Sequence, residues 1–114
     1  MTLDELAEAA RTDPARMPEL VALSRSQLAD PDPQTRTDAA AMAFYAVRQL
    51  LPRLTIAERT ALCQATLVEL DEAIARGLVG PKQMLASVLR TVLVDVVARP
   101  VETDDMLRAD SRVH

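Results

Sequence analysis

Apolar residues recur at helical spacing in five stretches of this chain. In the clearest stretch, between Thr55 and Arg76, one face carries Ile56, Leu62, Cys63, Leu67, Leu70, Ala73 and Ile74. Steps of three and four residues between apolar positions are typical of an amphipathic α-helix. The pattern predicts helices over residues 3–11, 18–29, 33–51, 55–76 and 80–99.

Short polar motifs predict where these helices begin. Thr2 precedes Glu5, and Thr55 precedes Glu58, by the three residues of a capping box, in which each side chain bonds a backbone N–H of the other. Asp32 stands directly before a proline, which is a favourable first residue of a helix. The predicted ends are marked by residues that stop or cap a helix: Pro14, Pro52, Gly77 and Pro100.

Composition supports an all-α fold. The 114 residues include only two glycines, 49% of them are hydrophobic and 2% are aromatic, so Ala, Leu, Val, Ile and Met must form the core. We expect a compact bundle of about five helices, with residues 33–51, 55–76 and 80–99 at its centre and the first two helices packed across them. The arrangement could also consist of two stacked α-hairpins. Residues 1–100 are expected to form a single helical domain, and the acidic segment 101–114 a frayed C-terminal tail.

The charge of the chain narrows the classes of partner. A formal net charge of −4 disfavours nucleic-acid binding, because phosphate attraction supplies most of that affinity. The densest basic stretch, Arg48, Arg53 and Arg59, is interrupted by Glu58 and is interpreted as a solvated surface. Neither a leader pattern nor an apolar run long enough to span a membrane occurs, so we expect a cytoplasmic protein. All basic residues except Lys82 are arginines, which is typical of a GC-rich bacterial genome.

One stretch resembles a known family. Residues 30–40 run Asp-Pro-Asp-Pro-Gln-Thr-Arg-Thr-Asp-Ala-Ala. This is similar to the signature of HEAT-type helical repeats, in which Asp and Pro occupy the turn between paired helices and a Val-Arg pair opens the second helix. Arg36 and Ala39 match the pattern, whereas Thr35 replaces the usual Val, and the junction around Gly80 carries no such motif. The resemblance implies a protein-binding scaffold of stacked hairpins.

Few residues are suited to catalysis or metal binding. Cys63 falls on an apolar helix face and is predicted to lie in the core, and His114 is the last residue of the sequence. One Cys and one His far apart do not make a zinc site, and neither a phosphate loop nor an EF-hand pattern is present. Asp95 lies in the polar arc of its helix and is expected at the surface. We therefore expect no enzyme, no metal and no cofactor.

Two surfaces are candidates for binding another protein. Met42, Tyr45 and Arg48 project from the side of their helix opposite its Ala-rich face, and these residue types are enriched in interfaces. The partner would be a different protein or a second copy of the chain. The alternative is that this helix is central and packs on both sides. The wide apolar arc of residues 80–99 indicates the centre of the bundle or half of a dimer contact.

The second candidate is an acidic face formed by Glu58, Glu69, Asp71 and Glu72. It would suit an inhibitor or immunity-type protein that caps a basic partner. A third hypothesis places a small apolar ligand in a pocket between residues 33–51, 55–76 and 80–99. The favoured prediction is a non-catalytic protein-interaction module, or small scaffold, that acts through the Met42, Tyr45 and Arg48 surface.

Overall fold

The computed structural model describes residues 1–113, and the side chains of residues 1–108. Within this part of the chain every regular element is a helix, so the all-α prediction is confirmed. The elements are α1 (Leu3–Thr12), η1 (Pro14–Arg16), α2 (Met17–Gln27), α3 (Pro33–Leu50), η2 (Leu51–Arg53), α4 (Ile56–Arg76), α5 (Gln83–Ala98) and α6 (Pro100–Val113), where η marks a 3-10 turn.

The helix starts follow from the capping residues in the sequence. Both predicted capping boxes are present, since Thr55 accepts from the backbone N–H of Glu58 and the Glu58 side chain accepts from the backbone N–H of Thr55, as do Thr2 and Glu5 at α1. Asp32 accepts from the backbone N–H of Thr35 at the start of α3. Each cap satisfies backbone donors that the first turn of a helix leaves free.

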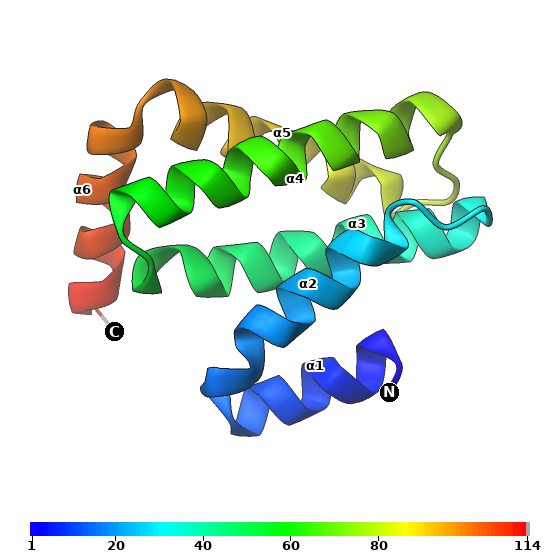
Figure 1. Cartoon of the computed structure of the whole chain (residues 1–114), viewed down its shortest axis with the longest axis horizontal. Coiled ribbons are helices and arrows are strands. Elements are labelled where there is room, and N and C mark those ends of the chain that lie inside the picture. Colours follow the sequence, from blue (N-terminus) through cyan, green and yellow to red (C-terminus); the bar gives the residue numbers. More distant parts are fainter. Residues whose placement is uncertain (114) are drawn as a thin grey trace.

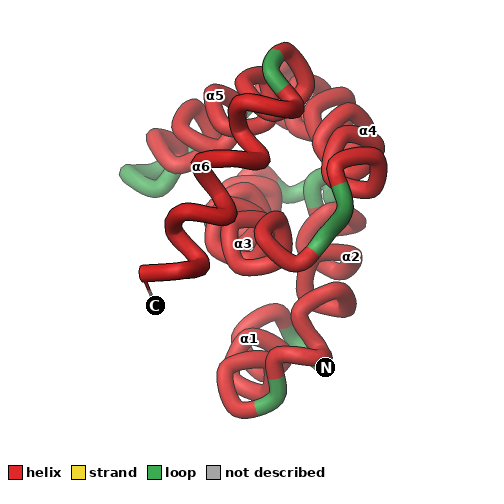
Figure 2. Tube along the Cα trace, turned by 90° about the vertical axis from the view of Figure 1, so that its left-hand side faces the viewer, coloured by secondary structure: helices red, strands yellow, loops and turns green. Residues whose placement is uncertain are grey.

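The helices are arranged as two antiparallel hairpins with a helix at either end. Helices α2 and α3 form the first hairpin and α4 and α5 the second, and the two associate through contacts between α3 and α5 (Figure 1). Helix α1 lies against α2 (Figure 2). Helix α6, at the left of Figure 1, contacts α4, α5 and η2. The hairpins thus lie side by side rather than forming a symmetric bundle.

Small residues allow α3 to pack closely on two neighbours. Ala39, Ala40, Ala43 and Ala46 are fully buried in this helix, which contacts α2 and α5. Ala side chains let helix axes approach each other. Helix α5 contacts α3, α4 and α6, and this accounts for its wide apolar arc. The larger members of the core are Leu6, Met17, Leu20, Val21, Leu28, Val47, Leu50, Leu51, Cys63, Leu70, Leu89, Leu93 and Val96.

Two arginines are buried where the ends of helices meet. Arg36 donates to the carbonyl oxygens of Asp30 (2.9 Å) and Pro31 (2.9 Å) before α3, and to those of Arg76 (3.2 Å) and Gly77 (2.8 Å) at the end of α4. It therefore joins the turn of the first hairpin to the second hairpin. A guanidinium group with five donors suits such a cluster of carbonyl oxygens.

Arg59 attaches the start of α4 to η2 and to α6, so the prediction that it is a solvated surface residue is wrong. Its side chain is 2% exposed and donates to the carbonyl oxygens of Leu51 (3.0 Å) and Leu54 (2.9 Å) and to Asp104 Oδ1 (2.9 Å). A buried charge requires such partners. The sequence gives no sign of this role, because Asp104 lies 45 residues further along the chain.

The segment after Pro100 differs from the frayed tail that we expected. Its described part forms helix α6, in which Thr103 and Asp104 are buried. The Thr103 hydroxyl donates to the Arg99 carbonyl oxygen (2.7 Å), and the ion pair between Asp104 and Arg59 attaches α6 to α4. His114 lies outside the described residues. None of the helices in the described part is long and apolar enough to cross a membrane.

Candidate functional site

One side of α3 is left open by the helices that pack around it. Tyr45 is 38% exposed, Arg48 and Gln49 are exposed, and Met42 is partly buried. Met42, Tyr45 and Gln49 are three or four residues apart and follow one stripe of the helix, and Arg48 lies next to Gln49 at the edge of this stripe. The structure therefore places the three residues proposed from the sequence together on this stripe.

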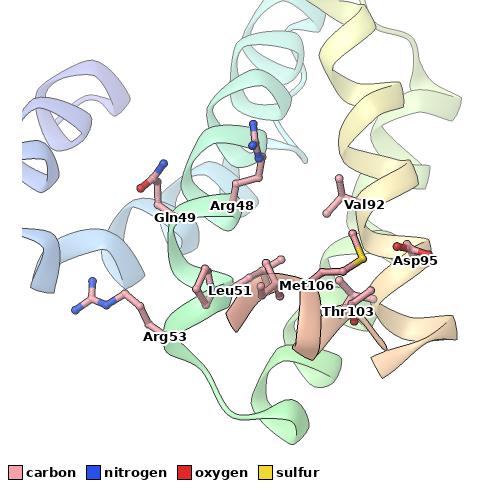
Figure 3. A pocket seen from close by; sticks show the side chains of 11 residues that line it. Arg48, Gln49, Leu51, Arg53, Val92, Asp95, Thr103 and Met106 are labelled. Carbon is pink, nitrogen blue, oxygen red and sulfur yellow. The ribbon is translucent and has the colours of Figure 1, made fainter. Parts of the chain in front are cut away.

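A cleft of about 610 Å³ runs along one flank of the stripe. It is open to solvent, and its walls come from the end of α3, from η2, from the second half of α5 and from α6. In Figure 3 Arg48, Val92 and Met106 point into the space between α3 and α5. Most of the wall is aliphatic, and its members are Leu51, Pro52, Val92, Val96, Met106 and Leu107.

The polar groups of the cleft include two arginines, Arg48 and Arg53. The Arg48 guanidinium lies 5.2 Å from the centre of the Phe44 ring, a cation–π contact that leaves its positive charge uncompensated. Arg53 donates to the Pro14 carbonyl oxygen (2.7 Å). Among the described side chains no carboxylate forms an ion pair with either arginine. Asp95, the one acidic residue in the described lining of the cleft, is already bound by Arg99 (2.8 Å).

A second depression of about 300 Å³ lies on the other flank of the stripe. Tyr45 and Met17 contribute to its lining, and Gln49 and Arg53 line both this depression and the larger cleft. Figure 3 shows Gln49 and Arg53 pointing away from Val92 and Met106. We call the surface formed by Met42, Tyr45, Arg48, Gln49 and Arg53 the α3 face, of which Gln49 and Arg53 line both depressions.

The acidic residues of α4 do not form one free surface. Glu58 belongs to the capping box, and the backbone and side-chain hydrogen bonds of Thr55 lower its pKa. Glu69 accepts from Arg25 of α2 (2.9 Å), whereas Asp71 accepts from Arg90 of α5 (2.7 Å) and thereby raises the pKa of that arginine. Glu72 is exposed and has no ion-pair partner in the described part. These carboxylates mainly connect α4 to its neighbours.

Cys63 is enclosed in the core, as predicted. Its side chain is fully buried, and burial raises the pKa of the thiol to about 11, an effect that the charge of Arg59 only partly opposes. A thiol in such surroundings stays protonated at neutral pH and is a poor nucleophile. Within the described side chains, no three Cys, His, Asp or Glu residues are grouped as metal ligands would be.

The sequence missed part of this surface. Helical periodicity identified Tyr45 and Arg48, but it could not join them to Met106, which is 60% exposed on α6. The sequence indicates Arg53 only as one of several basic residues. No local pattern could have revealed the cleft, because its walls come from four elements whose positions depend on tertiary packing.

Comparison of the chain with models of protein families, with curated proteins and with solved structures finds no match.

Proposed function

We propose that the protein is a non-catalytic interaction module and that a partner protein docks on the α3 face. The observation that carries the proposal is the exposed stripe of Tyr45, Arg48 and Gln49 between depressions of about 610 and 300 Å³. Tyr, Met and Arg are enriched in protein interfaces, and Tyr and Arg are also enriched at their energetically important positions. A helix that is anchored on two neighbours also presents such residues rigidly, which lowers the entropy lost on binding.

The packing of the hairpins supports the resemblance to HEAT-type repeats. The two hairpins associate through α3 and α5, their second helices, and the first helices α2 and α4 are joined by the ion pair between Arg25 and Glu69. Arg36, which belongs to the motif, bridges the turn of the first hairpin and the end of α4. We propose a short, two-hairpin scaffold of this kind, in which the α3 face serves recognition.

The structure favours the α3 face over the two alternative surfaces. A role as an acidic inhibitor would need free carboxylates on α4, but Glu58, Glu69 and Asp71 are occupied by contacts within the chain. A small apolar ligand would need an enclosed cavity between α3, α4 and α5. The cleft of about 610 Å³ instead lies open between α3, η2, α5 and α6.

Photo-crosslinking in the native cell tests the proposal. A benzophenone amino acid replaces Tyr45 in one variant and Ala61, an exposed residue of α4, in a matched control. We expect a crosslinked partner from position 45 and none from position 61. An adduct of twice the chain's own mass would identify a second copy as the partner and would support a self-associating module. The absence of any adduct specific to position 45 would overturn the proposal.

A further inference from the structure

We infer that the partner binds through an acidic segment that also carries aliphatic anchor residues. The inference rests on the proposed function and specifies the chemistry of its partner. It commits to another protein, rather than to a second copy of this chain or to a small molecule. Three features carry the inference: the charge of the α3 face, the aliphatic walls of the cleft beside it, and the extent of the two depressions together.

The charge of the face is opposite to that of the chain. Most basic side chains of this net-acidic protein are neutralised within it, because Arg11, Arg16, Arg25, Arg59, Lys82, Arg90, Arg99 and Arg108 all form ion pairs with carboxylates. Arg48 and Arg53 form no ion pair with a carboxylate of the described side chains, although both line the larger cleft. Complementary potential across an interface steers encounter and selects partners. A partner with carboxylates is therefore the one that gains most from this face.

The walls of the cleft require apolar groups beside those carboxylates. Val92, Val96 and Leu51 line it, and Met106 reaches across it with 60% of its surface exposed. Methionine is flexible and polarisable, so it adapts to the side chains that it meets. Leu, Ile or Met anchors of a partner would displace water from these surfaces, and the burial would stabilise the complex. The occupant is consequently amphipathic rather than simply anionic.

The extent of the face favours a peptide segment over a small molecule. The two depressions share Gln49 and Arg53, so one ligand can pass from the cleft beside Met106 to the pocket beside Tyr45. A single fatty acid would occupy only part of this surface. An amphipathic helix laid along a groove places anchors at every third or fourth residue, which suits such an elongated site.

A second copy of the chain fits this face poorly. In a two-fold dimer the same patch contributes to both sides of the interface. Such an interface would bring the charges of Arg48 and Arg53 from both protomers into one interface, and these like charges would repel without a free carboxylate among the described lining residues. The partner is thus expected to be a different, locally acidic chain.

Selection from a random library of 12-residue peptides displayed on phage tests the inference without assuming a sequence. Wild type is compared with Arg48→Glu, with Tyr45→Glu and with Lys82→Glu, a control with the same charge change just before α5. We expect enriched peptides that combine Asp or Glu with aliphatic residues. Their affinity, measured by fluorescence anisotropy, should fall about tenfold in Arg48→Glu and stay unchanged in Lys82→Glu.

The outcomes separate this inference from the proposed function. Enriched peptides that lack acidic residues but are lost in Tyr45→Glu would overturn the partner chemistry and leave the α3 face as the docking surface. No enrichment, or enrichment indifferent to both Tyr45→Glu and Arg48→Glu, would count against both. Tight binding of decanoate with no enriched peptide would show that the cleft holds a small anionic amphiphile, and the inference would then be wrong.

Discussion

The arginines at the helix ends and the arginines on the α3 face have opposite surroundings. Arg36 and Arg59 are buried and bound by carbonyl oxygens or by a carboxylate, so their charges serve the fold. Arg48 and Arg53 lie beside an open cleft and have no carboxylate partner in the described part of the chain. The same residue type is thus structural in one region and available for recognition in the other. Substitutions should therefore separate the two groups by their effects on stability and on binding.

The largest loss of stability is expected for Arg59→Met. The substitution leaves Asp104 and two carbonyl oxygens without their buried donor, and it should lower the free energy of unfolding by about 3 kcal/mol. Urea unfolding followed by circular dichroism measures this change. Arg90→Met, which removes an exposed ion pair with Asp71, is the control and should cost less than about 1 kcal/mol. Equal losses in the two variants would contradict the structural role of Arg59.

Arg36→Met should give a smaller but clear loss. The variant removes hydrogen bonds to carbonyl oxygens at the α2–α3 turn and at the end of α4, where solvent can replace some of them. We expect the free energy of unfolding to fall by about 2 kcal/mol. Hydrogen exchange should accelerate most around residues 28–36 and 74–79. Unchanged protection there would mean that Arg36 does not join the hairpins.

The ion pair of Asp104 should make stability depend on pH. The hydrogen bond from Arg59, helped by the charges of Arg59 and Arg108, holds the pKa of Asp104 below its ordinary value in the folded protein. Because the unfolded chain binds this proton more readily, the contribution is present at neutral pH and is lost as the pH falls below about 4. The free energy of unfolding of wild type should therefore fall toward that of Asp104→Asn as the pH is lowered. A difference in the free energy of unfolding between wild type and Asp104→Asn that stays constant from pH 7 to pH 3 would contradict the lowered pKa of Asp104.

The smallest effect on stability is expected for the carboxylates of α4. Glu69→Gln and Asp71→Asn each weaken a partly exposed ion pair with Arg25 or Arg90, and each should cost about 0.5 kcal/mol. The losses should diminish in high salt, because solvent-exposed charges are screened. Thermal melts at low and high ionic strength measure this. If either substitution instead abolished partner binding, the acidic residues of α4 would be the functional surface in place of the α3 face.

The sequence could predict the helices because their signals are local. Capping boxes at Thr2 and Thr55 and the cap at Asp32 depend on neighbours three residues away, and the structure contains all three. The burial of Arg36 and Arg59 depends on carbonyl oxygens and on Asp104 from distant segments. The local sequence therefore predicts a solvated surface position for Arg59. Helix α6 was missed for the same reason, since its attachment to α4 is tertiary.

The candidate site could also be predicted only in part: the exposed side of α3 could be predicted, and the cleft beside it could not. Helical spacing placed Tyr45 and Arg48 on a side of α3 away from its buried alanines. Whether another helix would cover that side could not be read from the spacing, because it depends on where α1, α5 and α6 pack. The cleft beside Arg48 exists because α6 packs next to η2 and α5. No local sequence pattern predicts this packing.

The most direct test of the account combines the crosslinking probe with a charge reversal. The benzophenone at position 45 is placed in wild type and in Arg48→Glu, and the melting temperature of each protein is measured alongside the yield of partner adduct. We predict that Arg48→Glu leaves the melting temperature unchanged, since its side chain is exposed, and largely abolishes the adduct. An undiminished adduct in the reversed variant, or a loss that only accompanies unfolding, would contradict the claim that the α3 face recognises an acidic partner.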